Sequence, residues 1–337
     1  MRKEVLYLIL ILLTWSGNAT AQDIHLSQFY TADQFLNPAM MGRHDGEWRF
    51  SANYRNQWRQ INGAPLSTGL VSFDKKFHYY SKEISGGIYY ARDQFSGFQT
   101  ITNKIYATGA YGVDWLKCNW RGGIQLGLVT NSTDLSTQTF PTQWDYPNGQ
   151  FDQSIYNGEE NIRPSQMYLD INIGGVWSKK FNRFNLVSGI AANHINRPKD
   201  TYFSQVFERR KMRGVFHTMA EIPLNGKWQF EPKIMWMWTT KANDMLLGSN
   251  LRIKTENKTI PSLYAGLFYR HGIKRTFDAV YPTFGLVFKR FDIGVSYDVN
   301  VSALSQGIKR VKTIEFSLIY TAPSNKVKYK IIPCDRY

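Results

Sequence analysis

The sequence predicts an all-β fold: a single closed antiparallel transmembrane β-barrel of about 14 strands. Three observations lead to this prediction. Apolar and polar residues alternate one by one in about fourteen extended runs, as they do in strands with two different faces. The apolar faces are rich in aromatic residues, which make up 15% of the 337 residues. The chain also begins with the features of an export signal.

Residues 1–21 are predicted to be a signal peptide. Arg2 and Lys3 give a basic start, residues 5–13 form a short apolar run, and residues 19–21 read Ala-Thr-Ala, a small-residue cleavage site. The alternative is a membrane anchor, which we disfavour because the apolar run is too short to span a bilayer. The mature chain is therefore expected to begin at Gln22.

Residues 22–46 are predicted to form a plug-like or rim-docking segment ahead of the barrel. Its apolar part, residues 28–42, fits neither the strand nor the helix period. Because this part is too apolar for a free tail, we expect it to pack in the barrel lumen or at its periplasmic mouth. Its candidate partner-binding residues are Phe29, Tyr30, Phe35, Leu36, Asn37 and Pro38. The alternative for Asn37 and Pro38 is a plain turn that seats the segment.

Residues 47–320 are predicted to form the barrel. In the first run, residues 47–58, the side chains of Phe50 and Tyr54 fall on one face, and those of Arg49 and Arg55 fall on the other. No segment keeps a helical period, which disfavours an α/β fold. After a break at residues 59–65 and a run around Val71 and Phe73, the further runs are 84–93, 101–115, 120–130, 167–179, 184–195, 216–222, 228–238, 245–254, 263–270, 283–289, 291–299 and 313–320.

The apolar faces decide between two β architectures. In a soluble sandwich they would form the core, whereas in a membrane barrel they face lipid. So many long runs would make an unusually large sandwich, but runs of about ten residues in an exported chain suit a barrel that crosses an outer membrane. The polar faces would then line the lumen, where Arg55, Trp58 and Asp74 are expected to meet near one end of the first hairpin. The candidate lumen network is Arg49, Arg55, Asp74, Glu231, Arg252 and Asp298.

The connections between the runs predict the orientation of the barrel. Short breaks, such as residues 116–119 and 289–290, alternate with longer ones, such as residues 131–163 and 196–213. Short turns face the periplasm and long loops face outward in such barrels. With an even number of strands, both termini are expected in the periplasm, and residues 321–337 are expected to form a periplasmic C-terminal tail.

Two of the predicted outer loops carry opposite charge. Residues 131–162 contain five acidic and no basic residues, whereas residues 196–213 are mainly basic. One interpretation is that both loops are simply solvated. The other is that they dock on each other or on one exported partner, and it makes Arg209, Arg210 and Lys211 candidate partner-binding residues.

The two cysteines, Cys118 and Cys334, are both expected on the periplasmic side. They are too few for a disulfide framework. A disulfide that ties the tail to the barrel rim is one alternative, since the periplasm permits disulfides. The other, which we favour, is two free or partner-directed thiols, with Cys334 as a candidate partner-binding residue.

Several function classes are disfavoured. A net charge of +15 suggests nucleic-acid binding, but the basic residues are scattered along an exported chain. The mean hydropathy of −0.38 excludes a bundle of transmembrane helices. No Gly-x-Ser-x-Gly motif and no metal-ligand spacing is present, so we expect no catalytic residues, no cofactor and no metal. His194 is expected to be a hydrogen-bonded rim or lumen residue rather than a ligand.

Several segments together resemble the PorP/SprF family of type IX secretion system outer-membrane proteins. The first are QFYTADQFLNPAMMG, then YRNQW with Pro65 and Thr68 downstream, then VSFD. The others are SGIAANHINRP, FEPKIMW, YAGLFYR, VSYDVNVSAL, IEFSLIY and the final PCDRY. No single motif is diagnostic, but their order covers essentially the whole mature chain.

The resemblance implies a fourteen-stranded outer-membrane barrel in a Bacteroidota-type cell. It implies a non-enzymatic role in type IX secretion and gliding motility, in which the barrel binds, delivers or anchors a large secreted protein. The partners it implies are a secreted surface protein or adhesin C-terminal domain, other type IX secretion components, a periplasmic peptidoglycan-linked protein and outer-membrane lipid. The alternatives are a porin-like channel for small solutes and a soluble surface sandwich for adhesion.

Overall fold

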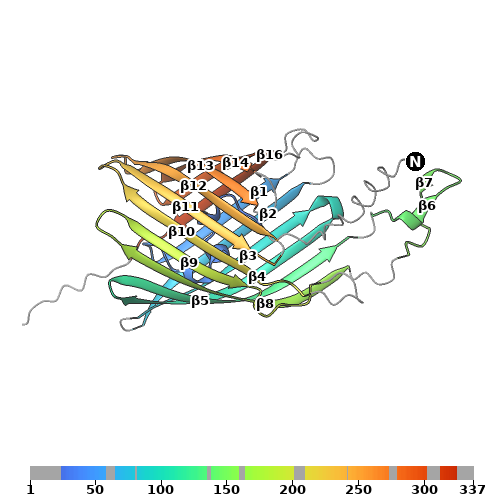
Figure 1. Ribbon diagram of the computed structural model, residues 1–337, viewed down its shortest axis with the longest axis horizontal. Coiled ribbons are helices and arrows are strands. Elements are labelled where there is room, and N and C mark those ends of the chain that lie inside the picture. The colour runs from blue at the N-terminus through green and yellow to red at the C-terminus, as the bar shows by residue number, and fades with distance from the viewer. Residues whose placement is uncertain are drawn as a thin grey trace, which may run out of the picture.

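The structure is a computed structural model that describes residues 24–57, 65–79, 82–134, 138–158, 164–200, 209–240, 242–272, 279–301 and 312–324. Its main body is a ring of long strands (Figure 1). The barrel strands are β1 (Trp48–Gln57), β2 (Leu66–Tyr79), β3 (Lys82–Phe95), β4 (Thr100–Trp115), β5 (Cys118–Thr133), β8 (Ser165–Lys180), β9 (Asn185–Asn193), β10 (Arg213–Pro223), β11 (Trp228–Trp238), β12 (Asn243–Lys254), β13 (Ser262–Gly272), β14 (Ala279–Phe288), β15 (Phe291–Asn300) and β16 (Lys312–Thr321).

The remaining elements are short. The chain before β1 contains η1 (Phe29–Thr31), α2 (Asp33–Leu36) and η2 (Pro38–Met40), and η3 (Ser96–Phe98) connects β3 to β4. The long connection between β5 and β8 holds η4 (Pro141–Gln143), β6 (Trp144–Asp145) and β7 (Gln150–Phe151), whose small hairpin projects beyond one end of the barrel (Figure 1). No helix within the described ranges is long and apolar enough to cross a membrane.

The sheet closes on itself. Each barrel strand pairs antiparallel with the next along the chain, β5 pairs with β8 across the hairpin insertion, and β1 pairs with β16. The predicted closed antiparallel barrel of about 14 strands is therefore confirmed, and each predicted run overlaps one of its strands. The sequence did not predict the β6–β7 hairpin, since two-residue strands are too short to show a period.

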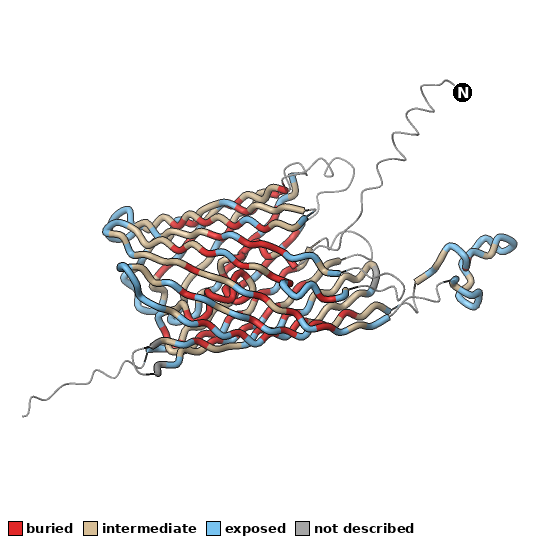
Figure 2. Tube along the Cα trace, turned by 60° about the horizontal axis from the view of Figure 1, so that its bottom comes forward, coloured by how far each residue is buried: buried red, intermediate tan, exposed pale blue. Residues whose placement is uncertain are grey.

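The two faces of the barrel are inverted relative to a soluble protein. In β1, the buried side chains are those of Arg49, Ser51, Asn53 and Arg55, while that of Tyr54 is exposed. Buried and more exposed residues alternate along the strands around the ring (Figure 2). The exposed positions include many large apolar side chains, which cover the outer wall. An apolar outer wall and a polar interior suit a barrel surrounded by lipid.

The connections at the two ends of the barrel differ. One end carries mostly tight turns, such as Leu116-Lys117, whose positive φ angles of 52° and 58° match the twist of a two-residue hairpin. The start of β1 and the end of β16 lie at this end, which we call the short-turn end. The other end carries the connections after β5 and β9, and we call it the long-loop end.

Several predictions fall on residues that the structure does not describe. These are the signal peptide at residues 1–21, Trp58, and the C-terminal tail beyond Ser324, which includes Cys334. Cys118 opens β5 at the short-turn end, half-buried, with its Sγ 3.4 Å from the carbonyl oxygen of Leu116. A Cys118–Cys334 disulfide and a periplasmic location of both termini therefore stay predictions.

The outward apolar side chains distinguish a membrane barrel from a soluble one. Leu126, in β5, is 57% exposed. Leu126→Lys would place a charge in lipid and is expected to lower the free energy of unfolding by about 2–4 kcal/mol. The measurement is urea unfolding in lipid vesicles, followed by heat-modifiable migration on gels. Tyr146→Lys, in the hairpin outside the barrel, serves as the control and should have little effect. Equal stability of the two variants would contradict the outward, lipid-facing wall.

Candidate functional site

The chain ahead of the barrel runs through the barrel lumen. We call residues 24–46 the luminal segment. Ser27 hydrogen-bonds residues in the long-loop half of the barrel, such as Asp298 near the end of β15, while Gly42 bonds Asp74 nearer the short-turn end. Buried residues follow most of this path, inside the ring of strands (Figure 2). The segment therefore occupies the lumen along much of its length instead of packing only at a mouth.

The local structure of the segment is set by a few polar residues. Its helices have one turn or less each, which is too short to be stable alone. Asn37 caps η2, because its side-chain oxygen accepts a hydrogen bond of 2.9 Å from the Ala39 backbone N–H, and Pro38 occupies the first helical position. The rest of its order comes from contacts with the barrel wall.

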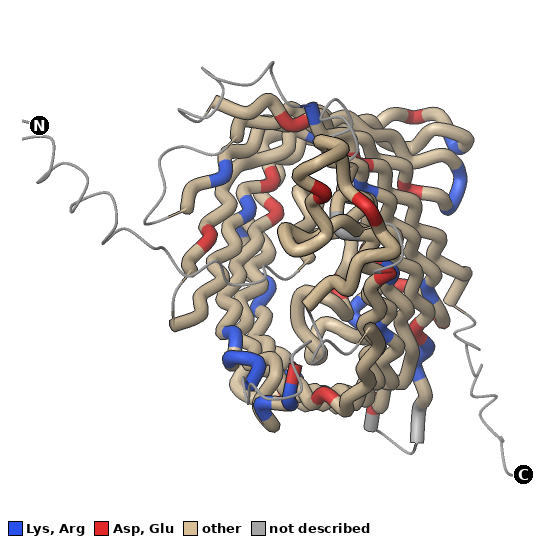
Figure 3. The backbone as a smooth tube through the Cα atoms, turned by 90° about the vertical axis from the view of Figure 1, so that its right-hand side faces the viewer, with Lys and Arg blue, Asp and Glu red and all other residues tan. Residues whose placement is uncertain are grey.

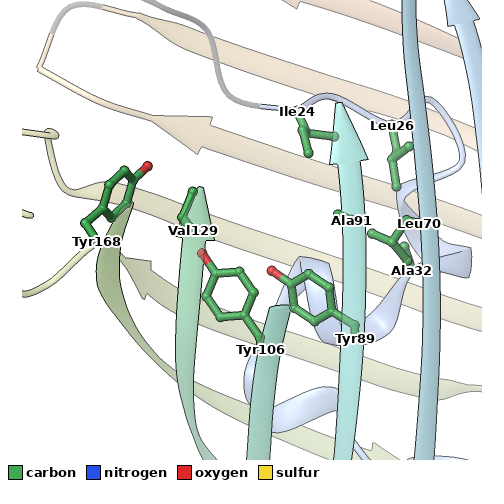
Figure 4. Packing of buried hydrophobic residues seen from close by; sticks show 9 residues of the cluster. All are labelled: Ile24, Leu26, Ala32, Leu70, Tyr89, Ala91, Tyr106, Val129 and Tyr168. Carbon is green, nitrogen blue, oxygen red and sulfur yellow. The ribbon is translucent and has the colours of Figure 1, made fainter. Parts of the chain in front are cut away.

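Apolar contacts attach the first half of the segment to one part of the wall. Ile24, Leu26 and Ala32 belong to a buried cluster whose other members come from β2, β3, β4, β5 and β8 (Figure 4). The wall members are Leu70, Tyr89, Ala91, Tyr106, Val129 and Tyr168. Among the described residues, the luminal segment supplies the inner members of this cluster.

The four apolar residues that the sequence singled out contact the barrel's own wall. The Tyr30 ring stacks on Phe268, with the ring centroids 5.5 Å apart. Phe29 and Leu36 are buried in a cluster with Phe268, and Phe35 meets the edge of Tyr89 at 6.5 Å. In this arrangement these side chains face the lumen wall and not an outside partner.

The largest polar cluster surrounds Arg55. The Arg55 guanidinium lies 3.0 Å from Glu315 Oε2 and 3.1 Å from Asp298 Oδ2, and Arg270 reaches Asp298 at 3.2 Å. The two oxygens of Glu315 also accept hydrogen bonds from the backbone N–H groups of Ser27 and Gln28, at 2.7 and 2.8 Å. The luminal segment thus supplies donors that a buried carboxylate needs.

A second cluster surrounds Arg49. Its guanidinium binds Asp33 of the luminal segment at 2.5 Å and Asp74 of β2 at 3.1 Å. Asp74 also accepts a hydrogen bond of 2.8 Å from the Gly42 backbone N–H, and His44 Nε2 lies 3.1 Å from the same oxygen. Arg49 therefore joins the wall to the segment through one carboxylate on each.

A third cluster lies on the part of the wall across the ring from β1. Glu231 of β11 binds Lys233 at 2.7 Å and Arg252 of β12 at 2.5 Å. The Lys233 ammonium also lies 4.2 Å from the centroid of the Tyr30 ring, a cation–π contact with the luminal segment. Residues of both charges are found along the wall in the view into the barrel (Figure 3).

The six candidate lumen residues are all buried or half-buried, but they form three clusters and not one network. The structure does not bring Arg55 and Asp74 together as we expected. In the β1–β2 pairing, Arg49 is opposite Asp74 and Arg55 is opposite Thr68, six positions further along β1. The partners of Arg55 come instead from β15 and β16, across the seam that closes the barrel.

Asn37, Pro38 and Ala39 sit against glycines of the wall. The Asn37 side-chain amide donates hydrogen bonds to the carbonyl oxygens of Gly175 and Ile190, at 3.1 and 3.2 Å. A Cβ atom added to Gly174 would lie 2.0 Å from Asn37 Oδ1. One added to Gly123 would lie 2.4 Å from the carbonyl carbon of Pro38. The wall needs glycine at these positions because the Asn37 side chain approaches Gly174, and the backbone of Pro38 approaches Gly123, so closely.

A fourth polar cluster occupies the rim between β8 and the β9–β10 connection. His194 Nδ1 lies 2.8 Å from Asp170, and its Nε2 accepts a hydrogen bond of 3.2 Å from Arg210. Since an arginine can only donate, this geometry selects the tautomer in which Nδ1 carries the proton. Arg210 also binds Asp200 at 2.5 Å, within its own loop.

The other charged loop residues have different surroundings. Arg209 and Lys211 are exposed on either side of the half-buried Arg210. In the acidic loop, Asp145 bonds Asn148, and Asp152 bonds Ser154, whose hydrogen bonds lower the pKa of the Asp152 carboxyl. These two carboxylates and Arg210 thus find partners within their own loops.

The candidate residues named from the sequence leave out several residues of the site. Glu315 and Lys233 stand at polar positions of alternating runs, which was a usable signal. Ser27 and Asp33 gave none, because the segment has no period to assign them a face. Within the described ranges, no three His, Cys, Asp or Glu side chains are grouped so that they could hold a metal ion.

Comparisons with known proteins agree with this architecture. A family model described as "Type IX secretion system membrane protein PorP/SprF" matches residues 18–320. No curated protein matches the chain. The solved structure of the CymD monoaromatic hydrocarbon channel is similar, with a TM-score of 0.51, 11% identity, and coverage of 91% of this chain and 95% of that one. The Ralstonia pickettii toluene transporter TbuX gives a TM-score of 0.48 at 9% identity, covering 91% and 96%. At such low identity the likeness to CymD shows the fold alone.

The Arg55 cluster predicts a large effect of charge removal. Arg55→Met takes one cation from two buried carboxylates and is expected to lower the free energy of unfolding by about 3 kcal/mol. The measurement is urea unfolding of the refolded barrel. Arg197→Met, at an exposed loop position, is the matched control and should stay within about 0.5 kcal/mol. An Arg55→Met protein as stable as this control would contradict the described cluster.

The glycine contacts predict selective release of the luminal segment. Gly174→Ala would clash with Asn37 and is expected to increase amide hydrogen exchange in residues 24–46 by about tenfold or more. The barrel strands should keep their protection. Gly122→Ala, where a Cβ atom would meet nothing within 4 Å, is the control. If the two variants exchange at the same rate in the luminal segment, the described contact does not hold the segment in place.

Proposed function

The chain belongs to the PorP/SprF family of type IX secretion system membrane proteins, and on this basis we propose that it is a non-enzymatic outer-membrane barrel that binds, delivers or anchors a large secreted surface protein. Family membership makes it part of the type IX secretion machinery. The proposal adds what the barrel does there.

The observation that carries the proposal is the occupied lumen. The luminal segment is held by the buried ion pair between Arg49 and Asp33 and by hydrogen bonds from Ser27 to Asp298 and Glu315, with the wall residues all on the adjacent strands β1, β15 and β16. A barrel that passed solutes would need a water-filled path through this region. A barrel that holds a partner needs a rigid surface instead, and a filled interior stiffens the wall.

The proposal also assigns partners to the two ends. Short turns face the periplasm in such barrels, so the short-turn end would meet the secretion components and a peptidoglycan-linked periplasmic protein. Cys334 and the tail would act on that side. The long-loop end, with exposed Arg209 and Lys211, would meet the secreted protein. Outer-membrane lipid would surround the apolar wall. Adhesin anchoring and gliding motility follow if the secreted protein is a mobile adhesin.

The test is recovery of partners from outer membranes. A tagged chain, extracted in mild detergent from secreting cells, is expected to copurify a secreted surface protein and at least one type IX secretion component, identified by mass spectrometry. An equally abundant tagged barrel of another family is the control. If the chain recovers neither class above that control, the proposed function is wrong.

The occupied lumen also separates this proposal from a porin-like channel. In planar bilayers the intact protein is expected to show no stable single-channel conductance. Removal of residues 24–41 is expected to produce such conductance, because the ring of strands stays closed without them. Stable channels formed by the intact protein would favour the channel function.

A further inference from the structure

One strand of the barrel wall extends beyond its neighbour. Along β5, strand β8 is paired from Ser165 to Ser178. On its other side it pairs with β9 only from Ile173 to Lys180, because β9 ends at Asn193. At the long-loop end, residues 165–172 of β8 therefore have a strand partner on one side only within the described parts of the chain.

The backbone groups on this edge alternate in direction. The Pro164 carbonyl oxygen accepts a hydrogen bond of 2.8 Å from the Thr133 N–H, so the even-numbered residues here bond β5. The odd-numbered residues face the open side. Ile171 and Leu169 are partly capped there, because the Asn196 side chain bonds the Ile171 N–H at 3.2 Å and the Leu169 carbonyl at 2.7 Å.

Beyond Asn196 the edge is bare among the described residues. The Leu169 N–H and both backbone groups of Met167 face the side where no strand lies. The side chains of Met167 and Leu169 are 67% and 68% exposed, more than any other large apolar side chain of the described barrel strands. An open edge of this kind is a ready template for another strand, and it is costly next to lipid.

The surroundings of the edge indicate which strand would fit. Ile173, the first β8 residue paired with β9, lines a cavity of about 710 Å³. Apolar side chains of Ile190, Met212 and Trp238 contribute to it. Four basic residues also line the cavity: Arg197, Arg209, Arg210 and Lys211. A fitting segment would therefore be extended, with apolar and acidic side chains.

We propose that residues 165–169 of β8 accept an extended, acidic segment of the secreted protein as an added β-strand, with Arg197, Arg209 and Lys211 binding its carboxylates. This inference rests on the proposed function and names the site of that contact. Backbone hydrogen bonds would supply affinity, and the cationic rim would select the segment. A lipid acyl chain suits the cavity less well, because it cannot satisfy the open N–H and C=O groups.

The alternating edge allows a backbone-specific test. Met167→Pro removes an N–H that points to the open side, while pairing with β5 uses the even-numbered residues, so the barrel is expected to fold. Heat-modifiable migration checks this. Met167→Ala is the matched control, since it shortens the same side chain but keeps the N–H. We expect Met167→Pro to reduce copurified secreted protein by about tenfold, and Met167→Ala by no more than about twofold.

A photo-crosslinking residue gives a second measurement. Placed at position 169 in secreting cells, it is expected to crosslink to a peptide of the secreted protein, and that crosslink should vanish in the Met167→Pro background. The control position is 126, which is 57% exposed on β5, a strand paired on both sides. Support requires crosslinks at 169 and none at 126.

Three outcomes overturn the inference while the proposed function stands. They are equal capture by the Met167→Pro and Met167→Ala proteins, crosslinks from position 169 to residues 201–208 of the same chain, and crosslinks to lipopolysaccharide. If the unaltered protein recovers no secreted protein at all, the proposed function fails and the inference fails with it.

Discussion

The need to match every buried charge inside the barrel governs this structure. Arg55, Asp298 and Glu315 would each be costly in the lumen without a partner. Their partners come from β1, β15 and β16 and from the backbone of the luminal segment. Removing the segment would leave Glu315 without two donors, and opening the barrel between β1 and β16 would separate Arg55 from both carboxylates. Closure of the barrel and occupation of its lumen therefore supply partners to the same buried charges.

These directed contacts distinguish the segment from a loosely bound tail. A loose tail would contact the wall through apolar side chains that slide without much cost. Here Asn37 is fixed to the carbonyl oxygens of Gly175 and Ile190, and Asp33 is fixed to Arg49. Directional bonds of this kind specify one position, although buried ion pairs add less to net stability than their number suggests. A stiff, filled barrel is suited to presenting fixed surfaces.

The requirement that backbone groups in a membrane be hydrogen-bonded also identifies a weak place in the wall. Most of the ring meets this requirement through complete strand pairing. At the long-loop end of β8 the requirement is met only in part, by the side chain of Asn196 acting in place of a strand. Membership in a secretion-system family suggests a use for this edge, because an extended segment of a secreted protein would pair with an open strand edge. The filled interior would thus keep the barrel rigid, whereas the incomplete edge of β8 would bind the secreted protein.

Much of the fold could be read from the sequence because strand alternation is a local signal. Phe50 and Tyr54 against Arg49 and Arg55 assign two faces without any knowledge of neighbouring strands. With export and strand length, this determines a barrel with a polar lumen. Residues 28–42 were recognised as a segment that must pack somewhere, because they are apolar and have no period.

Only the tertiary structure decided which polar residues meet. Arg55 and Glu315 are far apart in sequence, and they touch because the barrel closes with β1 beside β16 in one register. The expected pairing of Arg55 with Asp74 was wrong because the face of a residue follows from its period, whereas its depth follows from register. The path of the luminal segment and the early end of β9 likewise depend on contacts between distant parts of the chain, which no local pattern encodes.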